Sequence, residues 1–146
     1  MAFVLVRCDA DGQPLERVAS LAEEIQANCL GTAALYRKIG YVEPWVGYIA
    51  VDDGVGVGGG AFVGAPRDGR VEIAYYTLTE QIGKGYGTRT ATGLMEIARK
   101  HDPRAQLIAH TLQEENASTR ILQKLGFAVV GTAQDPDAGE VWEWRA

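Results

Sequence analysis

Three glycines on alternate positions, at 83, 85 and 87, separate an apolar segment from a segment with helical spacing. Glycine lets the backbone turn sharply and lets a ligand approach the main chain closely. The first N–H groups of a helix have no partner inside the helix, so a glycine turn at that point forms a cradle for an anion. The unit Gln81-Ile82-Gly83-Lys84-Gly85-Tyr86-Gly87-Thr88 therefore predicts a strand, a tight turn and a helix, with a phosphate-bearing cofactor at the turn.

The other apolar segments predict a sheet and its covering helices. Strand-like runs fall at residues 3–6, 45–51, 55–63, 71–78, 106–112, 127–132 and 141–145. Helical spacing covers residues 14–38, with a break near Gly31, and residues 88–101 and 116–125. Short turns between the second, third and fourth strands predict antiparallel pairing up to the glycine loop. We expect one domain over residues 1–146 with an α/β (α+β) fold, in which a single, mainly antiparallel central sheet carries helices on both faces.

Two loop regions are less distinctive. The glycine run at 58–60 has no helix pattern after it, so we expect a flat or bulged strand there, with a ligand loop as the alternative. The polar residues 133–139 predict a turn between the last two strands.

Composition limits the classes of function. A formal net charge of −5 argues against general nucleic-acid binding, which depends on clustered Lys and Arg, and favours amine-bearing substrates. No apolar run approaches the roughly 20 residues of a membrane span, and Arg7 and Asp9 interrupt the N-terminal run too soon for a signal peptide, so we expect a cytoplasmic protein that binds no membrane. Cys8 and Cys29 lack a CxxC spacing and a His cluster, so we expect free thiols and no metal site.

Two common phosphate loops do not fit the glycine unit. A Rossmann fingerprint has its third glycine three positions after the second, in a parallel unit that begins the fold, whereas these glycines are evenly spaced and follow hairpin-linked strands. A P-loop has Ser or Thr after its Gly-Lys pair, whereas Gly85 follows Lys84 here.

Four segments, in order, carry a resemblance to a known family. They are VEIAY at 71–75, GKGYG at 83–87, AHTLQEENAS at 109–118 and RILQKLGF at 120–127. In this combination the chain resembles the GNAT superfamily of acetyl-CoA-dependent N-acetyltransferases, particularly the branch that includes ribosomal-protein alanine N-acetyltransferases. The resemblance implies a GNAT-like fold, acetyl-CoA (coenzyme A) as cofactor, and a protein N-terminus or a small-molecule amine as acceptor. Homodimers are common in similar proteins.

The resemblance also implies where the cofactor binds. In the family, successive backbone amides of an Arg/Gln-x-x-Gly-x-Gly/Ala loop bind the pyrophosphate. The matching residues here are Ile82, in place of the usual Arg or Gln, Gly83, Lys84, Gly85, Tyr86, Gly87 and Thr88. The family places backbone amides of the strand before the loop, here Tyr76 and Thr77, beside the thioester carbonyl, and an asparagine, here Asn116, beside pantetheine. Asn116 and Thr88 are equally suited to capping helices.

Acyl transfer also needs groups that move protons. Free amines are protonated at neutral pH, so a base or a water relay has to accept a proton. Glu72 matches the catalytic glutamate of the histone-acetylating branch; the alternative is a solvent-facing or ion-paired strand residue. Many relatives have a tyrosine in the last helix as the acid for the thiolate, but Leu122-Gln123 stands there, which leaves Tyr75, Tyr76 or water. His110 can face the same wedge, although a lone strand histidine is more often structural.

Two hypotheses of function follow. The first is an N-acetyltransferase in which the acceptor amine attacks the thioester directly in a ternary complex, with Tyr36, Trp45 and Tyr48 as candidates for acceptor recognition. The alternative, suggested by Ile82 and by the missing helix tyrosine, is a non-catalytic acyl-CoA-binding or regulatory module on the same fold.

Overall fold

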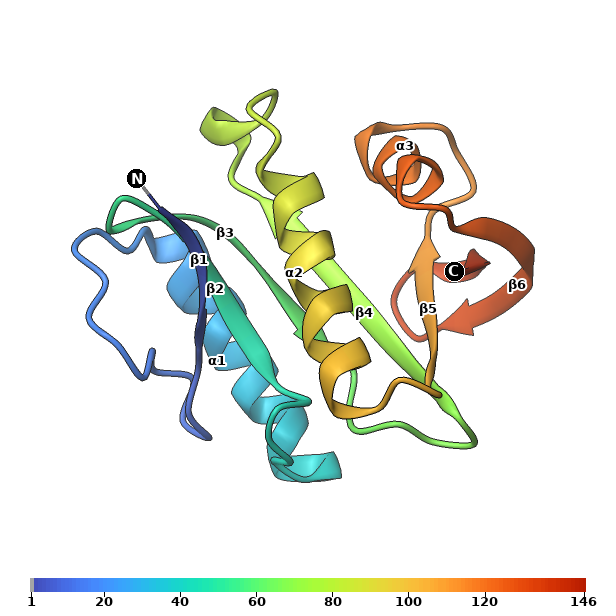
Figure 1. The fold of residues 1–146 in the computed structure, drawn as a ribbon, viewed down its shortest axis with the longest axis horizontal. Coiled ribbons are helices and arrows are strands. Elements are labelled where there is room, and N and C mark those ends of the chain that lie inside the picture. The colour runs from blue at the N-terminus through green and yellow to red at the C-terminus, as the bar shows by residue number, and fades with distance from the viewer. Residues whose placement is uncertain (1) are drawn as a thin grey trace.

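The computed structural model describes residues 2–146 and contains seven strands in one sheet, with helices beside it (Figure 1). The elements, in chain order, are β1 (Phe3–Arg7), α1 (Glu23–Ile39), β2 (Gly47–Asp52), β3 (Val55–Phe62), β4 (Arg70–Thr77), the short 3-10 helix η1 (Thr79–Gln81), α2 (Tyr86–His101), β5 (Gln106–Thr111), α3 (Ala117–Lys124), β6 (Ala128–Asp135) and β7 (Gly139–Arg145).

The sheet has the order β1-β2-β3-β4-β5-β7-β6. All neighbouring pairs are antiparallel except β4 and β5, which are parallel because α2 crosses over between them. The expected mixed, mainly antiparallel sheet is therefore confirmed.

The parallel pair is short, and this creates the central feature of the fold. β4 and β5 pair only from Arg70 with Gln106 to Glu72 with Ile108. Beyond Glu72 the two strands diverge, as Figure 1 shows at the upper ends of β4 and β5. We call the space between the diverging strands the wedge.

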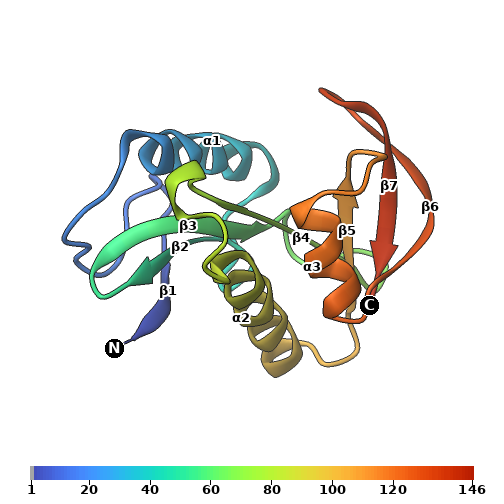
Figure 2. The same cartoon turned by 90° about the horizontal axis from the view of Figure 1, so that it is seen from above.

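Helices cover both faces of the sheet, as expected. Figure 2 shows α1 on one face and α2 on the other, with α3 beside the diverging end of β4 and β5. Ile25 of α1 and Leu94 of α2 are fully buried, and each such side chain contributes about 1.5–3 kcal/mol by leaving water. α1 and α2 pack against opposite faces of the sheet and so fix the positions of the strands beside the wedge.

The N-terminal helix is shorter than its sequence pattern suggests. Residues 14–22 are not helical, because Ala19 and Ser20 donate their N–H groups to Gly54 O (2.8 and 3.2 Å) and Gly56 donates to Ser20 O (2.8 Å). Bonds to the β2–β3 hairpin thus keep the end of this segment out of the helix. The predicted break near Gly31 is also wrong: α1 continues through this exposed position.

The structure also shows the conformations of the glycine run at 58–60 and of the polar segment 133–139. The run at 58–60 is part of β3, and a Cβ at Gly58 would lie 2.4 Å from Tyr76 O, so glycine permits close approach of β4. The strand interpretation is confirmed. The turn expected over 133–139 is shorter than predicted, because β6 and β7 extend into it and Asp135 Oδ1 accepts hydrogen bonds from the N–H groups of Asp137 and Ala138 (2.8 and 2.9 Å).

Candidate active site

A cleft of about 530 Å³ lies between the end of β4, the glycine loop, the start of α2 and one side of α3. Its lining includes residues 75–77 and 85–88 together with Gln81, Ile82 and Gly83. Most of the residues expected to bind the cofactor are therefore brought together on one cavity.

The glycine loop presents main-chain donors to this cleft. Gly83 and Gly85 have φ values of 90° and 83°, which residues with a side chain rarely adopt. The first intrahelical bond of α2 runs from Arg89 N to Gly85 O (3.1 Å), so the N–H groups of residues 86–88 precede the bonded turns. These groups and the helix dipole favour an anion here.

Three predicted loop residues differ in detail from expectation. Ile82 lines the cleft and its side chain is 59% exposed, but its N–H already donates to Thr79 O (3.3 Å). Lys84 lies outside the lining, and its Nζ donates to Gln81 Oε1 (2.9 Å). Tyr86 contributes its main chain, while its hydroxyl donates to Asp52 Oδ2 (2.6 Å).

Helix α3 supplies the opposite wall. Arg120 and Lys124 are one turn apart, so they lie on the same face of α3, and both line the cleft with Ser118 and Ile121. Sequence reasoning missed these two cations, although their i, i+4 spacing was a readable signal. They face the loop amides across the cavity and add positive charge where phosphates would bind.

Asn116 has a different setting from the one expected. It is the N-cap of α3: its Oδ1 accepts from Thr119 N (3.0 Å), and its own N–H donates to Thr119 Oγ1 (2.8 Å). It lies outside the lining of the cleft. The capping role is confirmed, and such a reciprocal cap stabilises the helix by about 0.5–2 kcal/mol.

Backbone direction decides which amides of β4 face the wedge. Leu78 N donates to Val57 O (2.9 Å) of β3, and the pairing of the two strands has a regular register from there. Because successive residues of a strand point their N–H groups to opposite sides, the Tyr76 amide also faces β3. The amides of Tyr75 and Thr77 face the wedge. The amide of Tyr76 is therefore turned away from the wedge, unlike that of Thr77, which faces the wedge as expected.

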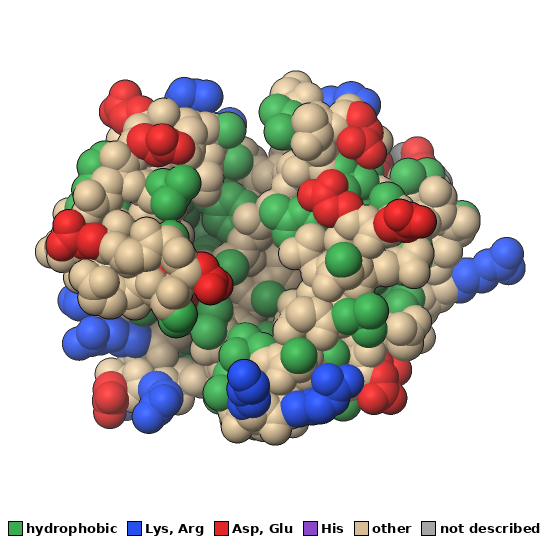
Figure 3. Space-filling model, turned by 180° about the vertical axis from the view of Figure 1, so that it is seen from behind, with side chains coloured by type: hydrophobic (Ala, Val, Ile, Leu, Met, Phe, Trp, Pro, Cys, Tyr) green, Lys and Arg blue, Asp and Glu red, His purple; other side chains and the backbone are tan. Residues whose placement is uncertain are grey.

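A second cavity, of about 270 Å³, opens on the α1 side of the sheet. Uncharged residues line it, among them Thr32 of α1, Gly47 of β2 and Ala74 of β4. Tyr75 and Tyr76 line both this cavity and the cleft, so the two spaces adjoin the same end of β4 from opposite faces of the sheet. We call this second space the α1-side pocket. Figure 3, seen from that side, shows a hollow between two lobes with acidic side chains on both flanks.

The three aromatic candidates for acceptor recognition divide. Tyr48 lines the α1-side pocket, with its hydroxyl bonded to Pro44 O (2.8 Å). Tyr36 and Trp45 belong to the core, where Tyr36 donates to Phe62 O and Trp45 packs edge-on against the Phe62 ring. Tyr48 contributes only its main chain to that pocket: it pairs with Gly60, where a Cβ would meet Leu94 of α2, so the Tyr48 ring lies on the α2 face of the sheet.

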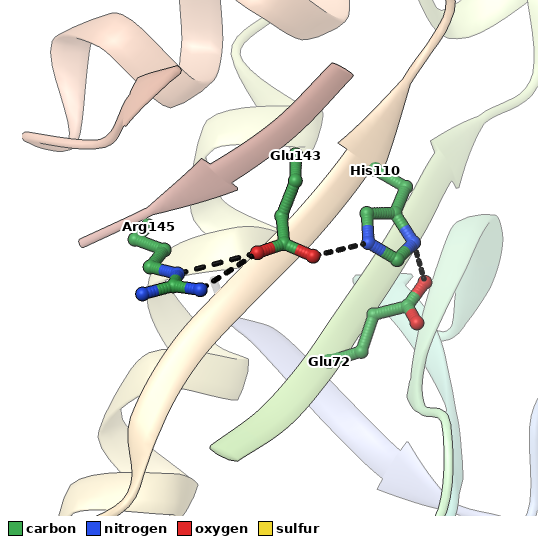
Figure 4. Close-up of polar contacts among 4 residues, drawn as sticks. All are labelled: Glu72, His110, Glu143 and Arg145. Carbon is green, nitrogen blue, oxygen red and sulfur yellow. Dashed lines mark hydrogen bonds and ion pairs between the residues drawn. The ribbon is translucent and has the colours of Figure 1, made fainter. Parts of the chain in front are cut away.

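Four residues with ionisable side chains form a continuous chain beside the wedge (Figure 4). His110 Nδ1 lies 3.4 Å from Glu72 Oε2, and His110 Nε2 lies 3.2 Å from Glu143 Oε1. Glu143 Oε2 in turn accepts from Nη2 and Nε of Arg145 (3.1 and 3.2 Å). A protonated imidazole can donate to both carboxylates, so His110 is not the isolated strand histidine that its sequence position suggested.

The two carboxylates of this chain have opposite electrostatic settings. Burial raises the pKa of Glu72; His110 lowers it, whereas Asp135 and Glu143 raise it further. The hydrogen bond from His110 is the main cause that lowers the pKa of Glu143, with Arg145 adding to it. A carboxylate with a raised pKa is the stronger base, so Glu72 is the member of the pair suited to accept a proton.

Tyr75 connects the two walls of the cleft. Its hydroxyl donates to Ser118 O of α3 (3.1 Å). The Ser118 Oγ lies 3.5 Å from the hydroxyl oxygen of Tyr75. Burial raises the pKa of Tyr75, so the phenol stays protonated at neutral pH. A proton donor is therefore present at the wedge although the last helix has no tyrosine.

The fold and this pair of opposed cavities define the class of acyl-CoA-dependent acyltransferases. The acetyltransferase (GNAT) domain family matches residues 10–128, and the chain belongs to this GNAT family of acetyltransferases. The resemblance read from the sequence is confirmed. No protein of curated function gives a significant sequence match.

Several solved structures share the fold. An IAA acetyltransferase from Bacillus cereus is 16% identical, with 99% of this chain and 98% of that chain covered and a TM-score of 0.70. RimL, a ribosomal L7/L12 alpha-N-protein acetyltransferase in complex with coenzyme A, is 15% identical, with 100% and 94% covered and a TM-score of 0.71. YncA, a putative acetyltransferase from Salmonella typhimurium with acetyl-CoA, is 18% identical, with 100% and 94% covered and a TM-score of 0.65. At these identities the likeness concerns the fold. Within residues 2–146, no helix is long and apolar enough to cross a membrane.

Proposed function

We propose that this protein transfers the acetyl group of acetyl-CoA to a primary amine by direct attack in a ternary complex. The observation that carries the proposal is the meeting of the cleft and the α1-side pocket at Tyr75 and Tyr76. A donor bound from one face and an acceptor bound from the other can then meet in the wedge without a covalent enzyme intermediate.

The residues of the cleft fit coenzyme A. The unbonded amides at the start of α2 suit a pyrophosphate, and Arg120 and Lys124 add positive charge on the facing helix. The amides of Tyr75 and Thr77 are available to a polar group lying along β4. Acetyl-CoA, when bound, supplies a thioester whose acetyl group can pass to a nucleophile.

The protein's own groups then have distinct tasks. The wedge-facing amides of β4 stabilise negative charge that develops on an oxygen beside them, an effect of on the order of 3 kcal/mol for one donor. Glu72 lies at the floor of the wedge, outside the lining of both cavities, so it accepts a proton from the amine through water. His110 holds the Glu72 carboxylate in place, and Tyr75 donates a proton toward the departing thiolate.

The acidic flanks of the hollow in Figure 3 favour cationic acceptors, since protonated amines are attracted to them. A thiol-release assay with acetyl-CoA tests the function directly, using N-terminal peptides, polyamines, aminoglycosides and small aryl or alkyl amines as acceptors. We expect turnover with at least one class. Saturable binding of acetyl-CoA without turnover on any amine would instead support the non-catalytic module. A homodimer stays a prediction that sedimentation at assay concentration tests.

Replacing one loop glycine tests the cofactor site. Gly85 and Gly139 have similar φ values of 83° and 79°, and a Cβ at either position meets open space. We therefore expect Gly85→Ala and Gly139→Ala to lose a similar free energy of unfolding, about 1–2 kcal/mol. Only Gly85→Ala should weaken coenzyme A binding, by about tenfold, because the strain re-aims the loop amides. Calorimetry measures the affinity, and equal affinities of the two variants would contradict the site.

A pH profile tests the role of His110. The base form of Glu72 is the carboxylate, so kcat/KM should rise as the pH passes its pKa. His110 lowers that pKa, so His110→Asn should raise it and move the acid limb of the profile to higher pH. Asp135 raises the same pKa, so Asp135→Asn should move the limb slightly to lower pH. If the acid limbs of the unmodified protein, His110→Asn and Asp135→Asn coincide, Glu72 is not the base.

A further inference from the structure

Two thiols that the proposed reaction does not use lie against each other on the α1 side of the sheet. Cys8 follows β1 and Cys29 lies in α1, and their Sγ atoms are 3.8 Å apart. Both are free thiols and nearly buried, with 6% and 8% of their surfaces exposed. They are also the chain's two cysteines, so neither has another thiol as an alternative intramolecular partner.

The thiols are nevertheless reachable by a small molecule. Both line the α1-side pocket, and the exposed residue Asn28 lines the same pocket, which therefore extends to the surface. A volume of about 270 Å³ admits a hydroperoxide easily. The pair thus lies in the wall of the space that we assign to the acceptor.

We propose that Cys8 and Cys29 form a reversible disulfide when a hydroperoxide enters the α1-side pocket, and that this bond hinders acceptor binding. The second half rests on the proposed function, whereas the disulfide itself does not.

The chemistry balances with hydrogen peroxide as the oxidant. The Cys29 thiolate attacks one peroxide oxygen, the O–O bond breaks, and a sulfenic acid and hydroxide form. Cys8 then gives up its proton and attacks the Cys29 sulfur, and the S–O bond breaks to release water. Two thiols and one peroxide become one disulfide and two waters.

The local electrostatics favours this order of attack. The contact with Cys8 lowers the pKa of the Cys29 thiol, against the opposing effect of burial. The same contact and burial raise the pKa of Cys8. Cys29 is therefore the thiol that ionises first, and Cys8 resolves the oxidised intermediate.

The bond would alter one cavity and spare the other. A disulfide holds its sulfurs about 2.05 Å apart, so the pair must approach from 3.8 Å and draw α1 toward the end of β1. Thr32 and Asn28 of α1 line the same wall and move with it. The cofactor cleft is lined by β4, the loop and the other two helices, so its shape should persist.

Peroxide treatment of the whole protein tests the proposal. After hydrogen peroxide, intact mass should fall by two hydrogen atoms, and Ellman's reagent in denaturant should count zero thiols in place of two. Acceptor kcat/KM should fall about tenfold or more while coenzyme A affinity stays constant, and dithiothreitol should reverse both changes. Cys8→Ser and Cys29→Ser, each compared with its own untreated sample, should show neither the mass loss nor a reversible fall of this kind.

The outcomes are separable. Two free thiols after treatment, or a disulfide between two chains on a non-reducing gel, would overturn the proposed bond. An internal disulfide with unchanged acceptor kinetics would overturn its effect on the pocket. If untreated protein acetylates no amine, the proposed function fails, and the mass and thiol counts still decide the disulfide.

Discussion

Glu72→Gln should lower kcat by about 100-fold or more at neutral pH, because general-base catalysis typically contributes a factor of this size. Glutamine keeps the shape of the side chain but cannot accept the proton. Glu72 lies outside the lining of the cleft, so coenzyme A affinity should stay unchanged. Steady-state thiol release on the best acceptor, together with calorimetry for coenzyme A, measures both quantities.

Glu96→Gln provides a matched control for this change. Glu96 is an exposed glutamate of α2, on a helix that also carries the cofactor loop at its other end. Its replacement should leave kcat within a factor of about two, as is usual for surface substitutions. If Glu72→Gln is as active as Glu96→Gln at neutral pH, the base is another group.

Trp144→Ala should reduce the free energy of unfolding by about 3–5 kcal/mol, the range for removal of a buried large aromatic side chain. Trp144 is 2% exposed, and its Nε1 donates to Thr111 Oγ1 of β5 (2.8 Å). The residue therefore fastens β7 to β5, the two strands that carry Glu143 and His110. Urea denaturation followed by circular dichroism measures the loss.

Two further variants separate packing from hydrogen bonding at this position. Trp144→Phe keeps most of the ring and loses the bond to Thr111, so it should cost about 1 kcal/mol from that bond and some more from lost packing. Trp142→Ala, on the same strand but half-buried, should cost less than Trp144→Ala. Equal losses for the Trp142 and Trp144 alanine variants would show that burial does not set the scale here.

Sequence reasoning succeeded where a local pattern determines the structure. The alternate glycines before a run with helical spacing predicted the turn and α2, and both lie where they were expected. Asn116 predicted the start of α3 because a capping side chain acts on amides only two or three residues away. The β2–β3 hairpin followed in the same way from its turn residues, whose backbone conformations are local properties.

Sequence reasoning failed where distant segments compete for a stretch of chain. Residues 14–22 have helical spacing, yet they are irregular, because backbone bonds join Leu15 to Arg7 and Ala19 and Ser20 to the β2–β3 hairpin. The sequence around position 110 does not predict that His110 contacts Glu72 and Glu143, because these residues lie on two other strands. The amide of Tyr76 was placed on the wrong side because strand direction depends on which neighbour the strand pairs with.

The sequence by itself determined the family, the loop that can cradle a diphosphate and the order of helices and strands, because these depend on neighbouring residues and on their spacing. Only the tertiary structure decided the wedge, the meeting of two cavities at Tyr75 and Tyr76, and the pairing of Cys8 with Cys29. Each of these depends on where β4 stops pairing with β5 or on how α1 packs against the sheet. Such contacts join residues far apart in the chain, and their geometry is set by packing and register rather than by any local pattern.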